Sequence, residues 1–304
     1  MLDVQNESQE AVPEETGAGT LRMMIPKGRI QDKVLALLGQ IGIKISFDER
    51  SYKPRCSEQR IEAKILKSQN IPSLVSLARH DCGFAGKDWI IEQNADVIEL
   101  VDLKFDPVRI VAAVPEALAA EGRASWSKRR LVVASEYRNL ALQYIERNQL
   151  QAYFIQTFGA TEALPPDDAD LIIDNTASGS TLKANKLVIV DELMNSTTRF
   201  ICSKEALKDP EKGKRLEELR MLMESALRAK EKVLLEMNVS SQDFERLVKD
   251  LPCMKSPTVS ELYNGDGYAI KIAVNSSEVS KLIPLLMSRG ARDILEYKLE
   301  KIVY

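Results

Sequence analysis

Histidine is almost absent from the chain, which has only His80 among its 304 residues. Mechanisms that need two histidines are therefore excluded. A Ser-His-Asp or Cys-His site would have to use His80, and no Gly-x-Ser-x-Gly nucleophile turn accompanies it. His80 falls where a helix is expected to end before a strand, so we interpret it as a polar residue at a helix C-terminus.

Paired cysteines, an excess of one charge and long apolar runs are also missing. Cys56, Cys82, Cys202 and Cys253 are scattered without a C-x-x-C pair, which disfavours a zinc site and a disulfide framework. The net charge of -3 gives no basic field that would attract nucleic acid. Without a bilayer-spanning apolar run or a signal peptide, we expect a cytoplasmic protein with no membrane contact.

The composition is that of an ordinary soluble protein, and the length suggests two or three domains. Residues 1–20 differ from the rest because they carry five acidic side chains and no lysine or arginine. They also lack hydrophobic periodicity. We therefore expect a disordered acidic tail over residues 1–20.

A strand–turn–helix joint at residues 170–182 is the most informative stretch. Leu171–Ile173 is an apolar run typical of a buried strand, Ser178–Thr181 is a turn of small and hydroxyl residues, and Leu182 begins a helical stretch. Backbone N–H groups in such a turn point outward and the helix dipole favours an anion. Gly179 lets a ligand approach the backbone closely. This geometry suits a phosphate group.

Asp170 and Asp174 precede the turn and, being four residues apart, lie on the same face of a strand. A carboxylate beside a phosphate is repulsive unless it accepts ribose hydroxyl hydrogen bonds or shares a Mg²⁺ ion. A ribose 5-phosphate would satisfy the turn and the acids together. The alternative, a plain joint with Ser and Thr as helix caps, stays open on these residues alone.

The stretch resembles the 5-phosphoribosyl-1-pyrophosphate (PRPP) loop of the ATP phosphoribosyltransferase family, with Thr176 where that family often has valine. Ala134–Asn139 and Gly159–Glu162 resemble two further family segments, although Arg138 replaces a proline. The resemblance implies catalytic roles for Asp170, Asp174 and Glu162, without a proton-transfer role for Glu162. It implies PRPP binding by Thr176, Ala177, Ser178, Gly179, Ser180, Thr181 and Leu182.

Two other segments resemble the nucleotide end of the family's site. Lys27-Gly28-Arg29 is similar to its Lys-Gly-Arg motif, and two cations at a strand–helix joint suit a polyphosphate. Gly86 and Asp88 fit its Asp-Leu-Gly-Ile-x-Gly-x-Asp pattern. The resemblance implies that these five residues bind ATP or pyrophosphate. Without it, Lys27 and Arg29 would be interpreted as solvated surface charges.

Alternating strands and helices predict an α/β fold with mainly parallel sheets. Expected strands include residues 21–25, 61–66, 97–103, 108–114, 131–134, 153–158, 187–192 and 199–202, with helices at 30–40, 139–147 and 209–235. The resemblance implies a two-lobed core of the periplasmic-binding-protein type II kind. Lobe I is expected at residues 21–104 and 193–224, and lobe II at residues 105–192.

Residues 225–304 follow the order β-α-β-β-α-β, which predicts a ferredoxin-like, ACT-like domain. Met254–Val259 and Gly290–Leu295 resemble the regulatory domain of the long-form enzymes. That resemblance implies histidine binding and feedback inhibition, with a pocket bordered by Asn238, Met254, Ser256, Thr258 and Asp293. A domain that serves only as an assembly surface is the alternative.

The resemblance implies Mg²⁺-dependent transfer of the phosphoribosyl group from PRPP to N1 of ATP, the first step of histidine biosynthesis. The metal would be held through the substrate, with Asp170 or Asp174 as a protein ligand. N1 already has a lone pair, so no activated side-chain nucleophile is required. The family also implies dimers and hexamers. A non-catalytic two-lobed sensor is the alternative, although no DNA-binding helix pair accompanies it.

Overall fold

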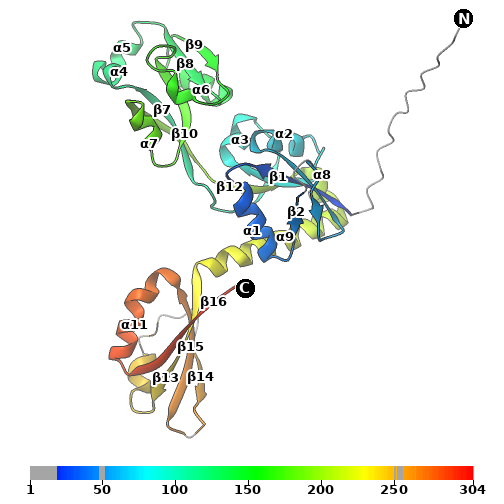
Figure 1. Ribbon diagram of the computed structural model, residues 1–304, viewed down its shortest axis with the longest axis vertical. Helices are drawn as coiled ribbons and strands as arrows, with labels where there is room; N and C mark the ends of the chain where they lie inside the picture. The colour runs from blue at the N-terminus through cyan, green and yellow to red at the C-terminus, as the bar shows by residue number, and fades with distance from the viewer. Residues whose placement is uncertain (1–18, 48–51, 250, 252–255, 264, 304) are drawn as a thin grey trace, which may run out of the picture.

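Three large sheets divide the described molecule into three units, each with its own core, and β2 (Ile45–Ser46) and β3 (Arg55–Cys56) form a small two-stranded sheet. The computed structural model describes residues 19–47, 52–249, 251, 256–263 and 265–303. Two five-stranded sheets form two lobes, and a four-stranded sheet forms a C-terminal unit (Figure 1). Lobe I lies between lobe II and the C-terminal unit in an extended arrangement. The expected acidic tail falls almost wholly outside the described residues.

Lobe I is built on a sheet whose central strands are covered on both faces. The strand β1 (Leu21–Lys27) is almost continuously buried, as expected for an apolar run with helices on either side. It pairs in parallel with both of its neighbours, and the fourth strand runs antiparallel. The order is β4 (Ile61–Lys67), β1, β5 (Cys82–Gly86), β12 (Thr198–Cys202) and β6 (Ile98–Asp102).

Lobe II repeats this arrangement with later strands. The central strand β10 (Leu171–Thr176) is parallel to one neighbour and antiparallel to the other. The order is β11 (Leu187–Ser196), β7 (Val108–Pro115), β10, β8 (Leu131–Ser135) and β9 (Ala152–Gln156). Its helices are α4 (Glu116–Glu121), α5 (Arg123–Trp126), α6 (Arg138–Arg147) and α7 (Ser180–Ala184).

The chain crosses between the lobes twice. Residues 103–107 connect β6 to β7, and Thr197 connects β11 to β12. In lobe I the late strand β12 lies antiparallel between β5 and β6, and in lobe II the early strand β7 lies antiparallel between β10 and the late strand β11. This topology confirms the predicted two-lobed core of the periplasmic-binding-protein type II kind.

The helices of lobe I agree in part with the ranges predicted from the sequence. The helix α1 (Gln31–Gln40) is close to its predicted range, and the predicted long helix is α9 (Pro210–Lys230). Leu216, Leu219 and Met223 of α9 are fully buried in the core of lobe I. The expected helix to residue 235 is too long, because β13 begins at Lys232. The short helices α2 (Ile71–Ser76), α3 (Lys87–Glu92) and α8 (Lys204–Lys208) complete the lobe.

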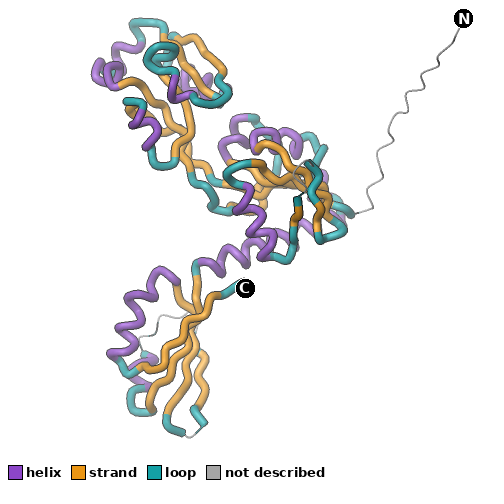
Figure 2. Tube along the Cα trace, in the orientation of Figure 1, coloured by secondary structure: helices purple, strands orange, loops and turns teal. Residues whose placement is uncertain are grey.

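The C-terminal unit is the predicted ferredoxin-like domain. Its antiparallel sheet has the order β14 (Thr258–Glu261), β15 (Gly267–Asn275), β13 (Lys232–Ser240) and β16 (Ala291–Lys298). Alternate residues of β13 are buried against α10 (Phe244–Val248) and α11 (Val279–Ser288), which cover one face (Figure 2). Residues 252–255 of the expected extended segment lie outside the described residues. Within the described chain, no helix combines the length and apolar character needed to cross a membrane.

Candidate active site

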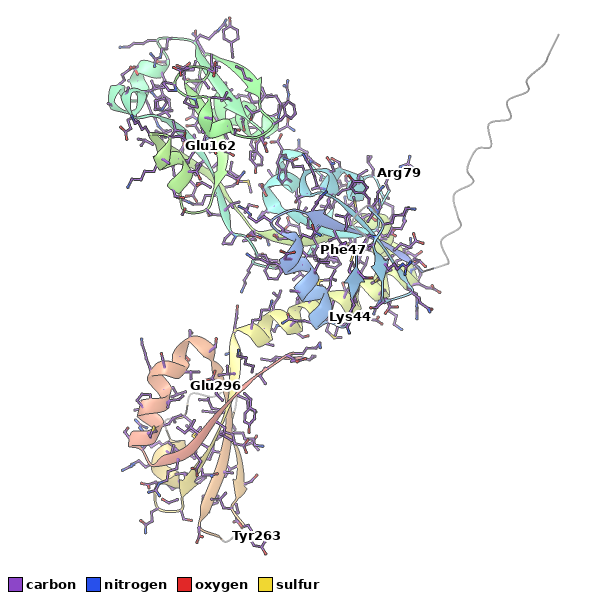
Figure 3. The ribbon with its side chains drawn as sticks, viewed as in Figure 1. Lys44, Phe47, Arg79, Glu162, Tyr263 and Glu296 are labelled. Carbon is purple, nitrogen blue, oxygen red and sulfur yellow. The ribbon has the colours of Figure 1, made fainter. Side chains whose placement is uncertain are left out.

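A cavity of about 390 Å³ opens at one edge of the lobe II sheet. The strands β8, β9 and β10 are mutually parallel, so their carboxyl ends meet there, where α/β sheets place ligands. Figure 3 shows Glu162 on this lobe. The lining residues are Arg29, Glu136, Gly159, Ala160, Thr161, Glu162, Asp174, Asn175, Thr176, Ala177, Ser178, Ser180, Thr181 and Leu182.

The turn between β10 and α7 forms one wall of this cavity and has the predicted order of strand, turn and helix, although α7 begins at Ser180 rather than at Leu182. Gly179 has a φ of +80°, a left-handed conformation that favours glycine. Its N–H donates to Thr176 Oγ1 at 3.0 Å, and the N–H of Ser180 donates to Ser178 Oγ at 3.3 Å. The first N–H groups of α7 have no partner inside the helix. The turn can therefore bind a phosphate through backbone and hydroxyl donors.

Asp174 provides the acidic side of the cavity. Burial raises the pKa of its carboxyl group to about 6, and the charges of Glu162 and Glu136 act in the same direction. The backbone N–H of Asn175 donates to Asp174 Oδ1 at 2.7 Å and opposes the shift. Burial also raises the pKa of Glu136. The three acids create a negative site that suits ribose hydroxyl donors or a metal-bound polyphosphate.

Asp170 lies outside the cavity, although the sequence placed it beside Asp174. Its Oδ2 accepts a hydrogen bond from the N–H of Val132 at 2.8 Å, which ties β10 to β8. Four residues along a strand span about 13 Å. Of the two acids, only Asp174 lines the cavity. The position of Asp170 therefore gives it a structural contact and argues against direct ligand contact.

Lobe I contributes Arg29 to the cavity. Lys27, Gly28 and Arg29 join β1 to α1, and the Arg29 side chain is 62% exposed. Its Nε lies 3.7 Å from Asp106 Oδ1. Lys27 instead places its ammonium group 5.8 Å from the centre of the Tyr52 ring. Only Arg29 of the three lines the cavity in this conformation.

Gly86 and Asp88 line a second cavity, of about 100 Å³, at the junction of the lobes. Asp88 is buried and both of its carboxylate oxygens are occupied. Oδ1 accepts from Ser196 Oγ at 2.6 Å, and Oδ2 accepts from the Tyr137 hydroxyl at 2.7 Å. A Cβ at Gly86 would lie 2.2 Å from Asp88 Oδ1, so the glycine makes room for the carboxylate. These contacts connect the two lobes.

Further contacts across the lobe junction involve residues that sequence reasoning did not select. Glu92 of α3 accepts hydrogen bonds from the N–H groups of Asn139 and Leu140 at the start of α6, at 2.9 and 3.0 Å. Gln69 Nε2 donates to Glu136 Oε2 at 3.1 Å. Glu136 directly follows β8 and belongs to the Ala134–Asn139 segment, but the structure alone shows that β8 is the parallel neighbour of β10. The hydrogen bonds of Glu92 had no sequence signal.

Of the five residues expected to border a histidine pocket, four are described. Asn238 Nδ2 donates to Asp293 Oδ2 at 3.1 Å on the exposed side of the C-terminal sheet. Ser256 and Thr258 are also exposed, the latter on the edge strand β14. Met254 lies outside the described residues. The structure therefore joins Asn238 and Asp293 directly, a pairing that is compatible with a shared polar site.

The donor set of the main cavity fits a hard cation only if the ligand supplies most of the coordination. Within the described residues, no group of three or more His, Cys, Asp or Glu side chains is arranged to hold a metal ion. Asp174, Glu162 and Glu136 nevertheless offer the carboxylate oxygens that Mg²⁺ prefers. A magnesium ion carried by phosphate oxygens, with one or two of these acids, is consistent with the cavity.

The chain is similar to known proteins over most of its length. A family model described as ATP phosphoribosyltransferase matches residues 67–225, and one described as "HisG, C-terminal domain" matches residues 229–301. Curated ATP phosphoribosyltransferases from Thermodesulfovibrio yellowstonii and Chlorobium phaeobacteroides are each 37% identical over 93% of this chain, covering 98% and 97% of the relatives.

One solved structure is also similar. It is an ATP phosphoribosyl transferase (HisG:HisZ) complex from Thermotoga maritima, with 26% identity and a TM-score of 0.59. The match covers 67% of this chain and 99% of that one. The structural similarity to this complex therefore extends over about two thirds of the present chain.

Proposed function

The chain belongs to the ATP phosphoribosyltransferase family, and on this premise we propose how its residues perform that reaction. The 5-phosphoribosyl group passes from PRPP to N1 of ATP, with release of pyrophosphate, as the first step of histidine biosynthesis. The bond from N1 to C1 of the ribose forms, and the bond from C1 to the pyrophosphate oxygen breaks. The electron pair of that bond leaves with the pyrophosphate. The observation that carries this proposal is the cavity formed by the β10–α7 turn and Asp174.

The turn over residues 176–182 anchors the 5-phosphate of PRPP. The hydroxyl groups of Thr176, Ser178, Ser180 and Thr181 and the first N–H groups of α7 supply hydrogen-bond donors. Ala177 and Leu182 line the same wall, and Gly179 sets the backbone conformation of the turn. Anchoring one end of PRPP fixes the position of its reacting carbon, which lowers the entropic cost of the reaction.

Asp174 accepts hydrogen bonds from the ribose hydroxyls. Departure of pyrophosphate builds positive charge on the ribose, as in glycoside cleavage. The carboxylate groups of Asp174, Glu162 and Glu136 then stabilise that charge from fixed positions. None of them has to move a proton, because N1 attacks with its own lone pair. We assign this role to Asp174 rather than Asp170, whose carboxylate is tied to Val132 outside the cavity.

Arg29 binds the phosphate chain from the lobe I side, with Lys27 and Gly28 beside it. Gly86 and Asp88 hold the lobe junction behind this site, and their contacts favour a supporting role for Asp88. Magnesium bound to the phosphates supplies positive charge that offsets the charge of the departing pyrophosphate. Arg29 and the turn belong to different lobes. Approach of the lobes would therefore fix the 5-phosphate end and the pyrophosphate end of PRPP at the same time.

The C-terminal domain binds histidine and inhibits the enzyme in this proposal. Asn238, Met254, Ser256, Thr258 and Asp293 border the effector site, and the Asn238–Asp293 hydrogen bond supports a shared polar site. We further propose that the enzyme is cytoplasmic and assembles into dimers and hexamers, as the family resemblance implies. It interacts with neither nucleic acid nor membranes.

The decisive experiment measures pyrophosphate release from ATP and PRPP, with and without Mg²⁺. Release that requires both substrates and the metal supports the proposal. A non-catalytic sensor would bind one or both ligands, detectable by calorimetry, without releasing pyrophosphate. Turnover that persists after thorough removal of divalent metal would overturn the role given to Mg²⁺.

A further inference from the structure

The crossover at residues 103–107 holds an acidic side chain in a strained position beside the active site. Asp106 has a φ of +45°, a left-handed conformation that is uncommon for residues other than glycine. Its neighbours keep the segment in place, since the N–H of Thr198 donates to the Phe105 carbonyl oxygen at 3.0 Å. Strain that is held by surrounding contacts often marks a functional position.

The Asp106 carboxylate is directed at the cationic side chains of lobe I. Its side chain is only 12% exposed. Oδ1 accepts a hydrogen bond from Lys33 Nζ at 3.0 Å and lies 3.7 Å from Arg29 Nε. Oδ2 is buried and accepts no hydrogen bond from any described protein group. A buried carboxylate oxygen without a donor is costly, so this oxygen has capacity for one more N–H group.

Arg29 is the side chain that connects Asp106 to the substrates. Both residues line the 100 Å³ cavity at the lobe junction, and Arg29 also lines the 390 Å³ phosphate cavity. An arginine held through Nε keeps its two terminal nitrogens free for a phosphate. Restraining such a long, exposed side chain before binding lowers the entropy lost when the ligand arrives.

We propose that Asp106 is a positioning residue that fixes the direction of Arg29 toward the phosphate cavity. It acts through Arg29 and does not touch the substrates, and the proposal rests on the proposed function of that cavity. With ligand bound, the free Oδ2 accepts the Nε–H group of Arg29, so that both terminal nitrogens stay available for the phosphate. Asp106 thereby links the crossover between the lobes to the group that binds pyrophosphate.

The test is a double-mutant cycle with Asp106→Asn, Arg29→Ala and the double variant. Asparagine tolerates the left-handed conformation and keeps the shape of the side chain, so the crossover should remain intact. We expect Asp106→Asn to lower kcat/KM about tenfold in the native background and less than about twofold in the Arg29→Ala background. A purely structural role for Asp106 would give the same loss in both backgrounds and would overturn the proposal.

The affinity for pyrophosphate, measured by calorimetry on the same four proteins, gives a second readout if Arg29→Ala has too little activity. Asp106→Asn should weaken binding only where Arg29 is present; equal weakening in both backgrounds would contradict the proposal. Lys33→Met is the matched control, because it removes the other cation on Asp106 without altering the cavity lining. It should leave kcat/KM unchanged, and a loss equal to that of Asp106→Asn would assign the effect to Lys33 instead.

Pyrophosphate release by the unaltered enzyme is measured first. If the unaltered enzyme does not turn over, the proposed function fails. If it turns over and the cycle is additive, only the positioning role of Asp106 fails.

Discussion

At the scale of single residues, Asp174 shows how a site can be costly for stability and useful for function. Its carboxyl group is removed from water and faces two further acids, so its pKa rises from 3.8 to about 6. Most folded proteins avoid such a cluster, because the charged form is disfavoured. A ligand that brings hydroxyl donors or positive charge relieves this cost. Part of the binding energy therefore comes from contacts at the reacting sugar.

The first prediction concerns the pH dependence of stability. Well below its unfolded pKa of 3.8, Asp174 is protonated in both the folded and the unfolded chain, so it costs nothing. Between about pH 4 and pH 6 the unfolded chain loses the Asp174 proton while the folded chain keeps it. The free energy of unfolding therefore falls as the pH rises, by up to about 3 kcal/mol. Asp174→Asn should therefore gain thermal stability relative to the native protein between pH 4 and pH 7. Melting curves with a difference independent of pH would contradict this.

The second prediction separates Asp174 of β10 from Asp170, which directly precedes that strand. Asp174→Asn should lower kcat/KM by about 5- to 150-fold, which corresponds to 1–3 kcal/mol for a hydrogen bond to a charged group. Asp170→Asn is the control, since it makes the same chemical change directly before the same strand but outside the cavity. It should affect melting temperature more than turnover. Steady-state kinetics with both variants would refute the assignment if Asp170→Asn proved the more damaging.

The sequence could predict Asp174 because it combines a strand end with a turn that suits phosphate. It could not separate Asp174 from Asp170, since the spacing alone does not show which end of the strand meets the cavity. Glu136 escaped prediction for a related reason. Its role depends on β8 being the parallel neighbour of β10, and sheet order is decided by packing over long sequence distances.

At the scale of elements, the β10–α7 turn depends on one left-handed residue. The third prediction is that Gly179→Ala raises KM for PRPP, because a side chain at φ +80° costs about 1–2 kcal/mol and distorts the turn. Space is not the cause, since the nearest atom to a Cβ there is Ile189 Cδ1 at 3.8 Å. KM for PRPP and melting temperature should be measured together.

Gly122 provides the matched control for that variant. It has a φ of +77° and joins α4 to α5, and a Cβ added there would meet no heavy atom within 4 Å. Its ψ of 155° is more restrictive for a side chain than the ψ of 2° at Gly179, so Gly122→Ala should lower stability by at least as much while leaving KM for PRPP unchanged. Equal changes in KM for the two variants would mean that general destabilisation, rather than the phosphate turn, explains the effect.

Long elements with a clear period can be predicted well from the sequence, and short ones cannot. The spacing of Leu216, Leu219 and Met223 indicates α9, and all three are buried as that spacing requires. The six residues of α3 look like part of a turn in the sequence, because fewer than two helical turns leave almost no periodic signal. Yet α3 carries Asp88 and Glu92, which make the principal polar contacts between the lobes.

At the scale of the whole molecule, contacts between residues far apart in the sequence hold the two lobes together. Asp88 and Ser196 are separated by 108 residues, so no local pattern could have predicted their hydrogen bond. The polar contacts of the C-terminal unit with lobe I include one ion pair and one backbone hydrogen bond. Lys104 Nζ lies 3.1 Å from Glu231 Oε1, and the N–H of Ile302 donates to the Ser225 carbonyl oxygen at 3.0 Å. We therefore expect the C-terminal unit to be separable from the lobes.

The fourth prediction is that a chain ending at Glu231 keeps turnover and loses inhibition by histidine. A cut near residue 225 would remove Ala226 and Ala229, which are buried at the end of α9, so the later boundary is the correct one to test. The core of the C-terminal unit shares no residue with the core of lobe I. Initial rates should be measured over a range of histidine concentrations, beside melting curves that report whether the lobes stay folded. Folded lobes that remain sensitive to histidine would place the effector site outside the C-terminal domain.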